Sequence, residues 1–325
     1  MRRELGFKGK RLIVDAVHTQ GEFSDFMSSL RLKPPFIVKP NWICTDYGHF
    51  TDPRILEWML RFLRAQGEVT VVESYSARNT TILRDLKLGM RLSDYERTRM
   101  RESEDGFLER TGIKSLLEEL RIEYVNVTEE VLERRTVDKE VVRGLVDSRY
   151  PPVLRNELYS FLPTKLHALR TGTFISLAKF KMFFTLCTKN MFGLIPEYVA
   201  YGSRSRAYHG RANEDLNQNI ADINKIYRSI FNVVGIVEGI NSLSYNIGRE
   251  TGSHRAVFGY RYDTLENRGL IYYGDDPLWL DAFIHQQCGK DPLDEEQLKL
   301  ASQVFGRWPS ELTEEAEKIE NPLKQ

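Results

Sequence analysis

Three lysines and an asparagine stand within an otherwise apolar stretch near the middle of the chain. Lys179 and Lys181 follow the apolar run 174–178, and Lys189 and Asn190 come soon afterwards. A lysine ammonium group is costly to bury without an anionic partner, so several lysines in apolar surroundings indicate a binding site. For a single lysine, a side chain that extends along the surface to reach water is the simpler interpretation. For the three lysines together with Asn190, we favour the functional interpretation.

The hydrophobic pattern predicts the elements that position these residues. Strand-like apolar runs alternate with amphipathic helical segments, which is typical of an α/β fold: a mainly parallel sheet flanked by helices on both faces. The predicted strands are 11–17, 36–41, 68–74, 122–127, 174–178, 233–239 and 270–274, and the predicted helices include 53–67, 217–230 and 277–287. Strands joined by a crossover helix run parallel and end at the same edge of the sheet, where ligands bind in open α/β folds.

Polar residues stand at the ends of these strands. They are Lys39, Asn41, Glu73, Lys181, Lys189, Asn190, Glu238 and Asp276, with His209 and Asp281 nearby. Lysines and amides suit an anionic substrate, so we assign this role to Lys39, Asn41, Lys181, Lys189 and Asn190. Groups that can transfer a proton are Glu73, His209 and Glu238.

Carboxylates also suit a hard cation, and we assign Asp276 and Asp281 to a divalent metal such as Mg²⁺. Two structural alternatives stay open. Lys39 and Glu73 can form a simple cross-strand ion pair, and Asp276 precedes Pro277 in the pattern of a helix N-cap.

The central stretch resembles the signature of a known family. Lys179-Phe-Lys181, Thr185 and Lys189-Asn190-Met-Phe-Gly193 are similar to the domain of unknown function 362 family, whose members are often joined to ferredoxin-type iron-sulfur modules. Further motifs agree in co-linear order over roughly residues 36 to 306. Where this chain has Met182 and Phe183, the family usually has threonine and histidine, so a step that depends on that histidine would be altered. His209 matches a histidine that commonly follows the signature.

The composition of the chain argues against several other classes of protein. The chain of 325 residues carries 46 basic and 46 acidic side chains, so no overall charge draws it to nucleic acid or to a membrane surface. A nucleic-acid binder that uses a loop with Arg204, Arg206 and Arg211 is the least favoured of our hypotheses. The three cysteines are widely spaced and form no Cys-x-x-Cys pair, so we expect no iron-sulfur cluster in this chain and a reducing cytoplasmic location. The charged amino terminus lacks a secretory core, and no apolar run is of membrane-spanning length.

These observations predict one α/β domain over residues 1–325, in which the charge-dense region 76–152 forms an insertion or lid. A polar segment over 242–251 is expected to cover the site. The function that we expect is a cytoplasmic enzyme acting on a phosphate- or carboxylate-bearing small molecule. The alternative, suggested by the resemblance, is a non-catalytic redox or cofactor-handling accessory protein that works with a ferredoxin-type partner. No P-loop, nucleophile elbow or dinucleotide glycine fingerprint is present.

Overall fold

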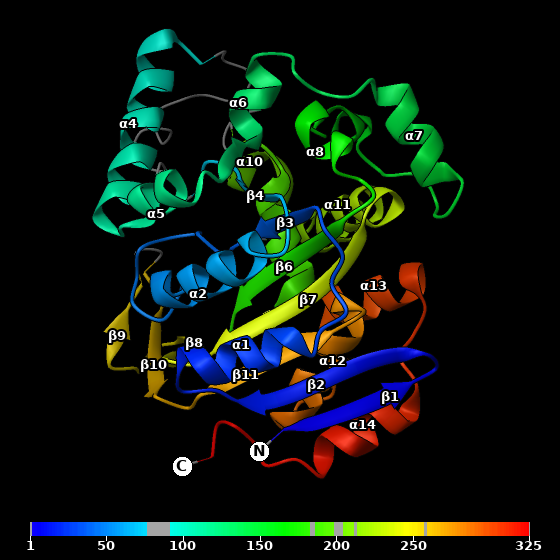
Figure 1. Ribbon diagram of the computed structural model, residues 1–325. Coiled ribbons are helices and arrows are strands. Elements are labelled where there is room, and N and C mark those ends of the chain that lie inside the picture. The colour runs from blue at the N-terminus through cyan, green and yellow to red at the C-terminus, as the bar shows by residue number, and fades with distance from the viewer. Residues whose placement is uncertain are drawn as a thin grey trace.

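A mixed sheet forms the centre of the molecule (Figure 1). The computed structural model describes residues 2–76, 92–182, 186–197, 204–210, 213–256 and 259–324, apart from the side chains of 205, 206 and 247–249. Within these residues the sheet has the strand order β1-β2-β11-β7-β6-β3-β4-β5. The bounds are Arg3–Phe7 for β1, Lys10–Ala16 for β2, Phe36–Lys39 for β3, Val69–Glu73 for β4, Glu123–Asn126 for β5, Thr173–Lys179 for β6, Asn232–Gly239 for β7 and Leu270–Gly274 for β11.

The strands from β7 to β5 in this order run parallel, which confirms the predicted α/β class with a mainly parallel sheet. Every residue of β3, β4 and β6 is buried, as expected for parallel strands with helices on both faces. The remaining strands, β1, β2 and β11, join by antiparallel pairing. In β11, Gly274 pairs with Gly235 and Leu270 pairs with Gly239. The chain therefore leaves β11 at the edge opposite to the one where β7 ends.

Helices cover both faces of the sheet (Figure 1). Their bounds are Gln20–Ser28 for α1, Pro53–Arg64 for α2, Asp94–Arg110 for α4, Ile113–Leu120 for α5, Val127–Leu132 for α6, Lys139–Asp147 for α7, Thr164–Ala168 for α8, Cys187–Asn190 for α9, Arg204–His209 for α10, Leu216–Ile230 for α11, Pro277–Gln287 for α12, Glu296–Phe305 for α13 and Ser310–Glu317 for α14. The described residues also contain two 3₁₀ segments, Asn156–Ser160 and Met191–Leu194.

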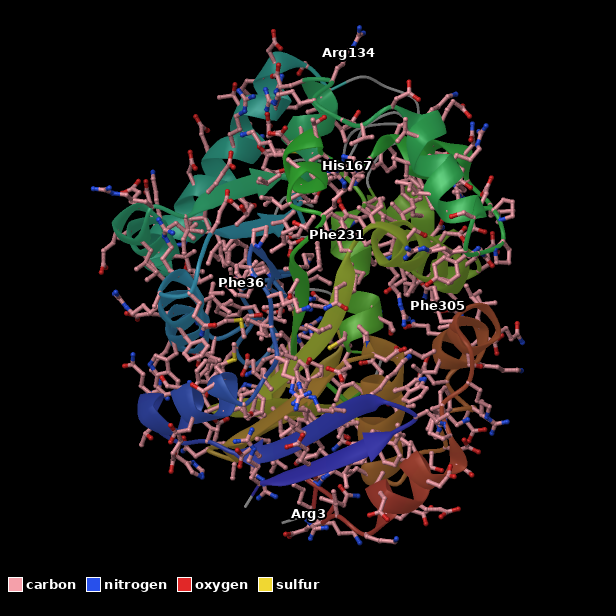
Figure 2. The ribbon with its side chains drawn as sticks, turned by 45° about the vertical axis from the view of Figure 1, so that its right-hand side comes forward. Arg3, Phe36, Arg134, His167, Phe231 and Phe305 are labelled. Atoms are coloured by element: carbon pink, nitrogen blue, oxygen red, sulfur yellow. The ribbon has the colours of Figure 1, made fainter. Side chains whose placement is uncertain are left out.

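Alternate residues of each strand enter apolar clusters on opposite faces. Phe36 and Val38 of β3 pack with α1, α2 and α5, whereas Ile37 packs with α11 on the other side. Figure 2 labels Phe36 and Phe231, one from each of these two clusters, and both are buried. The two clusters fix the sheet between layers of helices, so the ends of its parallel strands form a rigid edge.

The region 76–152 contributes both a strand and helices. The strand β5 pairs with β4 at the end of the sheet, and in the chain it stands between the helices α4 and α5 and the helices α6 and α7. Residues 77–91 of this region lie outside the described residues. The helix α4 begins at a capping box: the Ser93 side chain accepts a hydrogen bond from the backbone N–H of Glu96, and the Glu96 carboxylate accepts one from the backbone N–H of Ser93.

A small second sheet lies beside the carboxyl ends of β6 and β7 (Figure 1). It has the order β8-β10-β9, with bounds Ser242–Arg249, Arg261–Glu266 and His254–Arg255. The backbone N–H of Met182 donates to the carbonyl oxygen of Ser244 over 2.9 Å, so the chain that leaves β6 continues along β8. The polar segment 242–251 is thus largely a strand next to the predicted site.

Candidate functional site

Lys39 and Glu73 meet at the carboxyl edge of the sheet. They end the neighbouring parallel strands β3 and β4, and the Nζ atom of Lys39 lies 2.7 Å from Oε2 of Glu73. The same ammonium group donates to the carbonyl oxygen of Pro40 over 2.7 Å and to Oδ1 of Asn190 over 3.2 Å. Three acceptors match the three donors of a lysine, and both side chains of the pair are buried. The cross-strand ion pair that we left open is present.

Lys179 and Glu238 repeat this arrangement two strands away. They are register partners on β6 and β7, and the Nζ atom of Lys179 lies 3.0 Å from Oε2 of Glu238. Oε1 of Glu238 also accepts a hydrogen bond from the backbone N–H of Asp52 over 3.1 Å. Burial raises the pKa of Glu238 to about 7, although the charge of Lys179 opposes this shift. The carboxyl group is therefore poised between its two protonation states near neutral pH.

Two asparagines connect the Lys39–Glu73 pair to Lys181. Oδ1 of Asn190 accepts hydrogen bonds from Lys39 and, over 3.3 Å, from Nδ2 of Asn41. Oδ1 of Asn41 in turn accepts from Nζ of Lys181 over 2.9 Å, and Lys181 also donates to the carbonyl oxygen of His49 over 2.9 Å. Among the described residues, no carboxylate forms an ion pair with Lys181. Burial lowers the pKa of Lys181 to about 8.

Lys189 lies near both Lys181 and His209, as the effects of their charges show. Burial lowers the pKa of Lys189 to about 7, and the charge of Lys181 lowers it further, while Glu295 opposes the shift. Burial likewise lowers the pKa of His209 to about 4, with a contribution from the charge of Lys189. The His209 ring lies against Phe192, with 5.2 Å between ring centroids. Lys189 is thus close enough to both Lys181 and His209 for their charges to interact.

Asp281 holds in place the helix that carries Lys189 and Asn190. From α12 its carboxylate accepts hydrogen bonds from the backbone N–H groups of Leu186, Cys187 and Thr188, over 3.1, 2.8 and 2.9 Å, and from the hydroxyl of Thr188. These contacts anchor the first turn of α9, the helix that carries Lys189 and Asn190. Burial raises the pKa of Asp281 to about 6. Protein donors thus surround the carboxylate that we assigned to a metal.

Asp276 does not join the other polar residues, and our expectation that it would was wrong. Because β11 runs antiparallel to β7, Asp276 lies at the opposite edge of the sheet. It caps α12 by accepting from the backbone N–H of Leu278 over 3.0 Å, and it forms ion pairs with Arg228 and Lys10. A magnesium site shared by Asp276 and Asp281 stays a prediction.

Gly193 and Arg204 belong to the surroundings of the Lys39–Glu73 pair, although the sequence did not lead us to assign them to the site. A Cβ atom on Gly193 would lie 2.7 Å from both Oε1 of Glu73 and Nζ of Lys39, so any side chain there would displace this ion pair. The guanidinium of Arg204 donates to the carbonyl oxygens of Gly193 and Ile195 over 3.0 and 2.9 Å. Arg204 is buried, whereas we considered it for a nucleic-acid surface. The glycine that closes the lysine-asparagine motif was the available signal.

The departure from the family signature lies partly within the described residues. Met182 is buried in an apolar cluster with Phe180 and Leu243. Phe183 and Thr185 lie outside the described residues, and so does Arg211.

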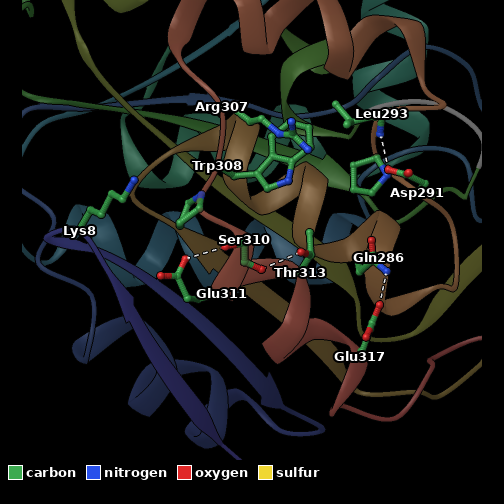
Figure 3. A pocket seen from close by; sticks show the side chains of 12 residues that line it. Lys8, Gln286, Asp291, Leu293, Arg307, Trp308, Ser310, Glu311, Thr313 and Glu317 are labelled. Carbon is green, nitrogen blue, oxygen red and sulfur yellow. Dashed lines mark hydrogen bonds between the residues drawn. The ribbon is translucent and has the colours of Figure 1, made fainter.

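A surface hollow of about 810 Å³ lies away from these residues (Figure 3). It is bounded by the turn between β1 and β2 and by the carboxyl-terminal helices, and its lining includes Lys8, Gln286, Asp291, Arg307, Glu311 and Glu317. None of the residues that we assign to the site lines this hollow. Acids and bases are mixed within it, so the hollow lacks the excess of lysines found at the carboxyl edge.

Fold and site together define an α/β protein with buried lysines and asparagines at the carboxyl edge of a parallel sheet. Residues 37–286 match the family described as Domain of unknown function (DUF362), and because this match covers most of the chain, the protein belongs to that family. The predicted resemblance is confirmed. No curated protein and no solved structure matches the chain. None of the described helices has the length and apolar character needed to cross a membrane.

Proposed function

We propose that this protein is an enzyme that binds an anionic small molecule, bearing phosphate or carboxylate, at the carboxyl edge of its parallel sheet. The edge is where ligands bind in open α/β sheets, because the strand ends there present polar side chains to a common space. Lys181, Lys189, Asn41 and Asn190 would hold the anion, and Lys39 would position Asn190 for this role.

The contacts of Lys181 carry the proposal. The other two lysines at the strand ends, Lys39 and Lys179, each have a carboxylate partner within 3.0 Å. Lys181 instead donates to two neutral oxygens of Asn41 and His49. A partly buried ammonium group with neutral partners gains most from a bound anion, since the anion supplies the missing charge.

Proton transfer is the second part of the proposal. Glu238, with a pKa of about 7, is in the range where a carboxyl group both gives and takes a proton readily. Burial lowers the pKa of His209 to about 4, so at pH 7 its ring is neutral and would accept a proton only as a weak base. Glu73 is held in its ion pair and would act through Lys39.

The experiment is calorimetric titration of the purified full chain with inorganic phosphate, sulfate and acetate. We expect binding of at least one of these anions by the wild-type protein. The double variant Lys181→Ala/Lys189→Ala should abolish this binding while the far-ultraviolet circular dichroism spectrum stays unchanged. A charge-matched control, Lys299→Ala/Lys318→Ala, removes two lysines from the exposed carboxyl-terminal helices and should bind as the wild type does.

Binding that persists in the Lys181→Ala/Lys189→Ala variant would contradict the anion site. Native mass spectrometry before and after denaturation adds a second test, because an enzyme with a buried anion site is expected to retain a ligand through purification. The accessory alternative predicts instead that the protein is recovered without an anion and binds a ferredoxin-type partner.

A further inference from the structure

Three side chains with different donor atoms meet in the loop between β3 and α2. Cys44 offers a sulfur atom, Asp46 a carboxylate oxygen and His49 a ring nitrogen, and one such atom of each residue lies within 4.8 Å of the other two. Cys44 and His49 are buried, and Asp46 is partly buried. Cys44 forms no disulfide. All three residues come from the short sequence Cys-Thr-Asp-Tyr-Gly-His.

A tight turn brings Asp46 and His49 together. The backbone N–H of His49 donates to the carbonyl oxygen of Asp46 over 3.0 Å. Gly48, the third residue of the turn, has a φ of 70°, which glycine adopts without steric cost. The hydroxyl of Ser244 donates to the carbonyl oxygen of Gly48 over 2.7 Å, so the second sheet holds the turn in place.

The ring of His49 is held on one side and has an unused nitrogen. Its centroid lies 4.0 Å from that of Tyr262, at an interplanar angle of 31°, and Tyr262 in turn stacks on His254. The Nε2 atom of His49 is buried and has no hydrogen-bond partner among the described residues. A buried nitrogen without a partner costs free energy, and a bound ion would remove this cost.

We propose that Cys44, Asp46 and His49 bind a divalent transition-metal ion of the Zn²⁺ type. Thiolate, imidazole and carboxylate are the ligands that zinc takes in proteins, whereas a sulfur ligand disfavours Mg²⁺ and Ca²⁺. Bonds of about 2.0–2.3 Å place ligand atoms roughly 3.5 Å apart around a tetrahedral ion, so small side-chain rotations suffice to close the site. Three protein ligands leave a fourth position open, as in catalytic zinc sites.

Lys181 stands next to this metal site. Its Nζ atom lies 2.9 Å from the carbonyl oxygen of His49, so an anion held by Lys181 would lie close to the metal. This coupling rests on the proposed anion site, but the metal site itself does not.

The test uses Co²⁺ as a spectroscopic substitute for Zn²⁺, with the purified full chain in a buffer free of phosphate, sulfate and carboxylates. We expect one equivalent of Co²⁺ to bind with a thiolate-to-cobalt charge-transfer band in the near ultraviolet, and Zn²⁺ to displace it. Cys44→Ser should abolish the band. His49→Gln should weaken binding at least as much as the roughly 10–100-fold loss caused by changes next to metal ligands. The control Cys288→Ser changes another buried cysteine and should bind normally.

A wild-type protein that binds no Co²⁺, or binds it without the thiolate band, would overturn the proposal. So would a thiolate band that persists in Cys44→Ser. The wild-type spectrum decides the question even if a variant does not fold. Because the titration contains no anionic ligand, its outcome is independent of the calorimetric test of Lys181 and Lys189.

Discussion

At the scale of single residues, the lysines at the carboxyl edge of the sheet have different surroundings. Lys39 and Lys179 are buried with a carboxylate on the neighbouring strand, which lowers the cost of burying their charge. Lys181 has neutral partners, and its pKa falls to about 8. A buried ion pair is weak evidence for net stabilisation, but removing one partner is costly because the other charge is then buried alone.

We therefore expect Glu238→Gln to destabilise the fold by about 3–5 kcal/mol, because the ammonium group of Lys179 loses its counter-charge. The glutamine can still accept the hydrogen bond from Asp52. Lys179→Met should cost less at pH 7, because the raised pKa of Glu238 lets its carboxyl group become neutral by taking up a proton. The double variant should be more stable than the sum of the single effects. Urea denaturation measures all three.

The control for these three variants is Lys318→Met, which breaks an exposed ion pair with Glu315 and should leave the free energy of unfolding unchanged. If Glu238→Gln is as stable as the wild type, the pair does not have the energetic role that its burial indicates.

The pKa of Lys189 predicts a pH dependence of anion binding. Burial lowers this pKa to about 7, so the ammonium form is present below that pH and is lost as the pH rises through it. Sulfate, whose own charge does not change in this range, should therefore bind more weakly as the pH increases from 6 to 8.5, by roughly tenfold per pH unit between the pKa of Lys189 and that of Lys181, about 8, and more steeply above it. Calorimetry at several pH values measures this change.

Lys189→Arg is the matched variant, because a guanidinium group keeps its charge throughout this range. Its sulfate affinity should stay nearly constant from pH 6 to about 7.5 and fall only above that, where Lys181, with a pKa of about 8, loses its proton. An equally steep decline in Lys189→Arg would assign the titration to another group.

At the scale of elements, the short helix α9 depends on the longer helix α12. A helix of one turn is not stable alone, and its first N–H groups need acceptors. Asp281 of α12 supplies them for Leu186, Cys187 and Thr188. The position of Lys189 and Asn190 is therefore determined by a carboxylate far away in the sequence.

Asp281→Ala should consequently lower both stability and anion affinity. Each buried N–H group left without an acceptor costs about 1–3 kcal/mol, so the free energy of unfolding should fall by several kcal/mol. Denaturation by urea and titration with phosphate measure the two effects. Asp276→Ala removes an equally buried helix-capping acid at the opposite edge, and it should lower stability with no change in affinity. Unchanged phosphate affinity in Asp281→Ala would show that α9 does not need this anchor.

At the scale of the whole molecule, the balanced total of 46 basic and 46 acidic residues conceals a local excess of lysine. Parallel strands bring Lys39, Glu73, Lys179 and Glu238 to one edge. The second sheet closes over the loop of Cys44, Asp46 and His49 beside that edge. The proposed anion and metal sites are therefore neighbours through the tertiary structure.

The sequence by itself determined the family, the α/β class and the strand ends that carry Lys39, Glu73 and Glu238. These follow from local periodicity and from the rule that strands joined by a crossover helix are parallel. Only the tertiary structure decided the direction of β11, which moved Asp276 to the opposite edge, and the pairing that gives Lys39 and Lys179 carboxylate partners but leaves Lys181 with neutral ones. It also brought the side chains of Cys44 and His49 together. Strand direction and side-chain pairing depend on contacts between residues distant in sequence, or on a turn held by a distant strand, and local patterns carry no information about them.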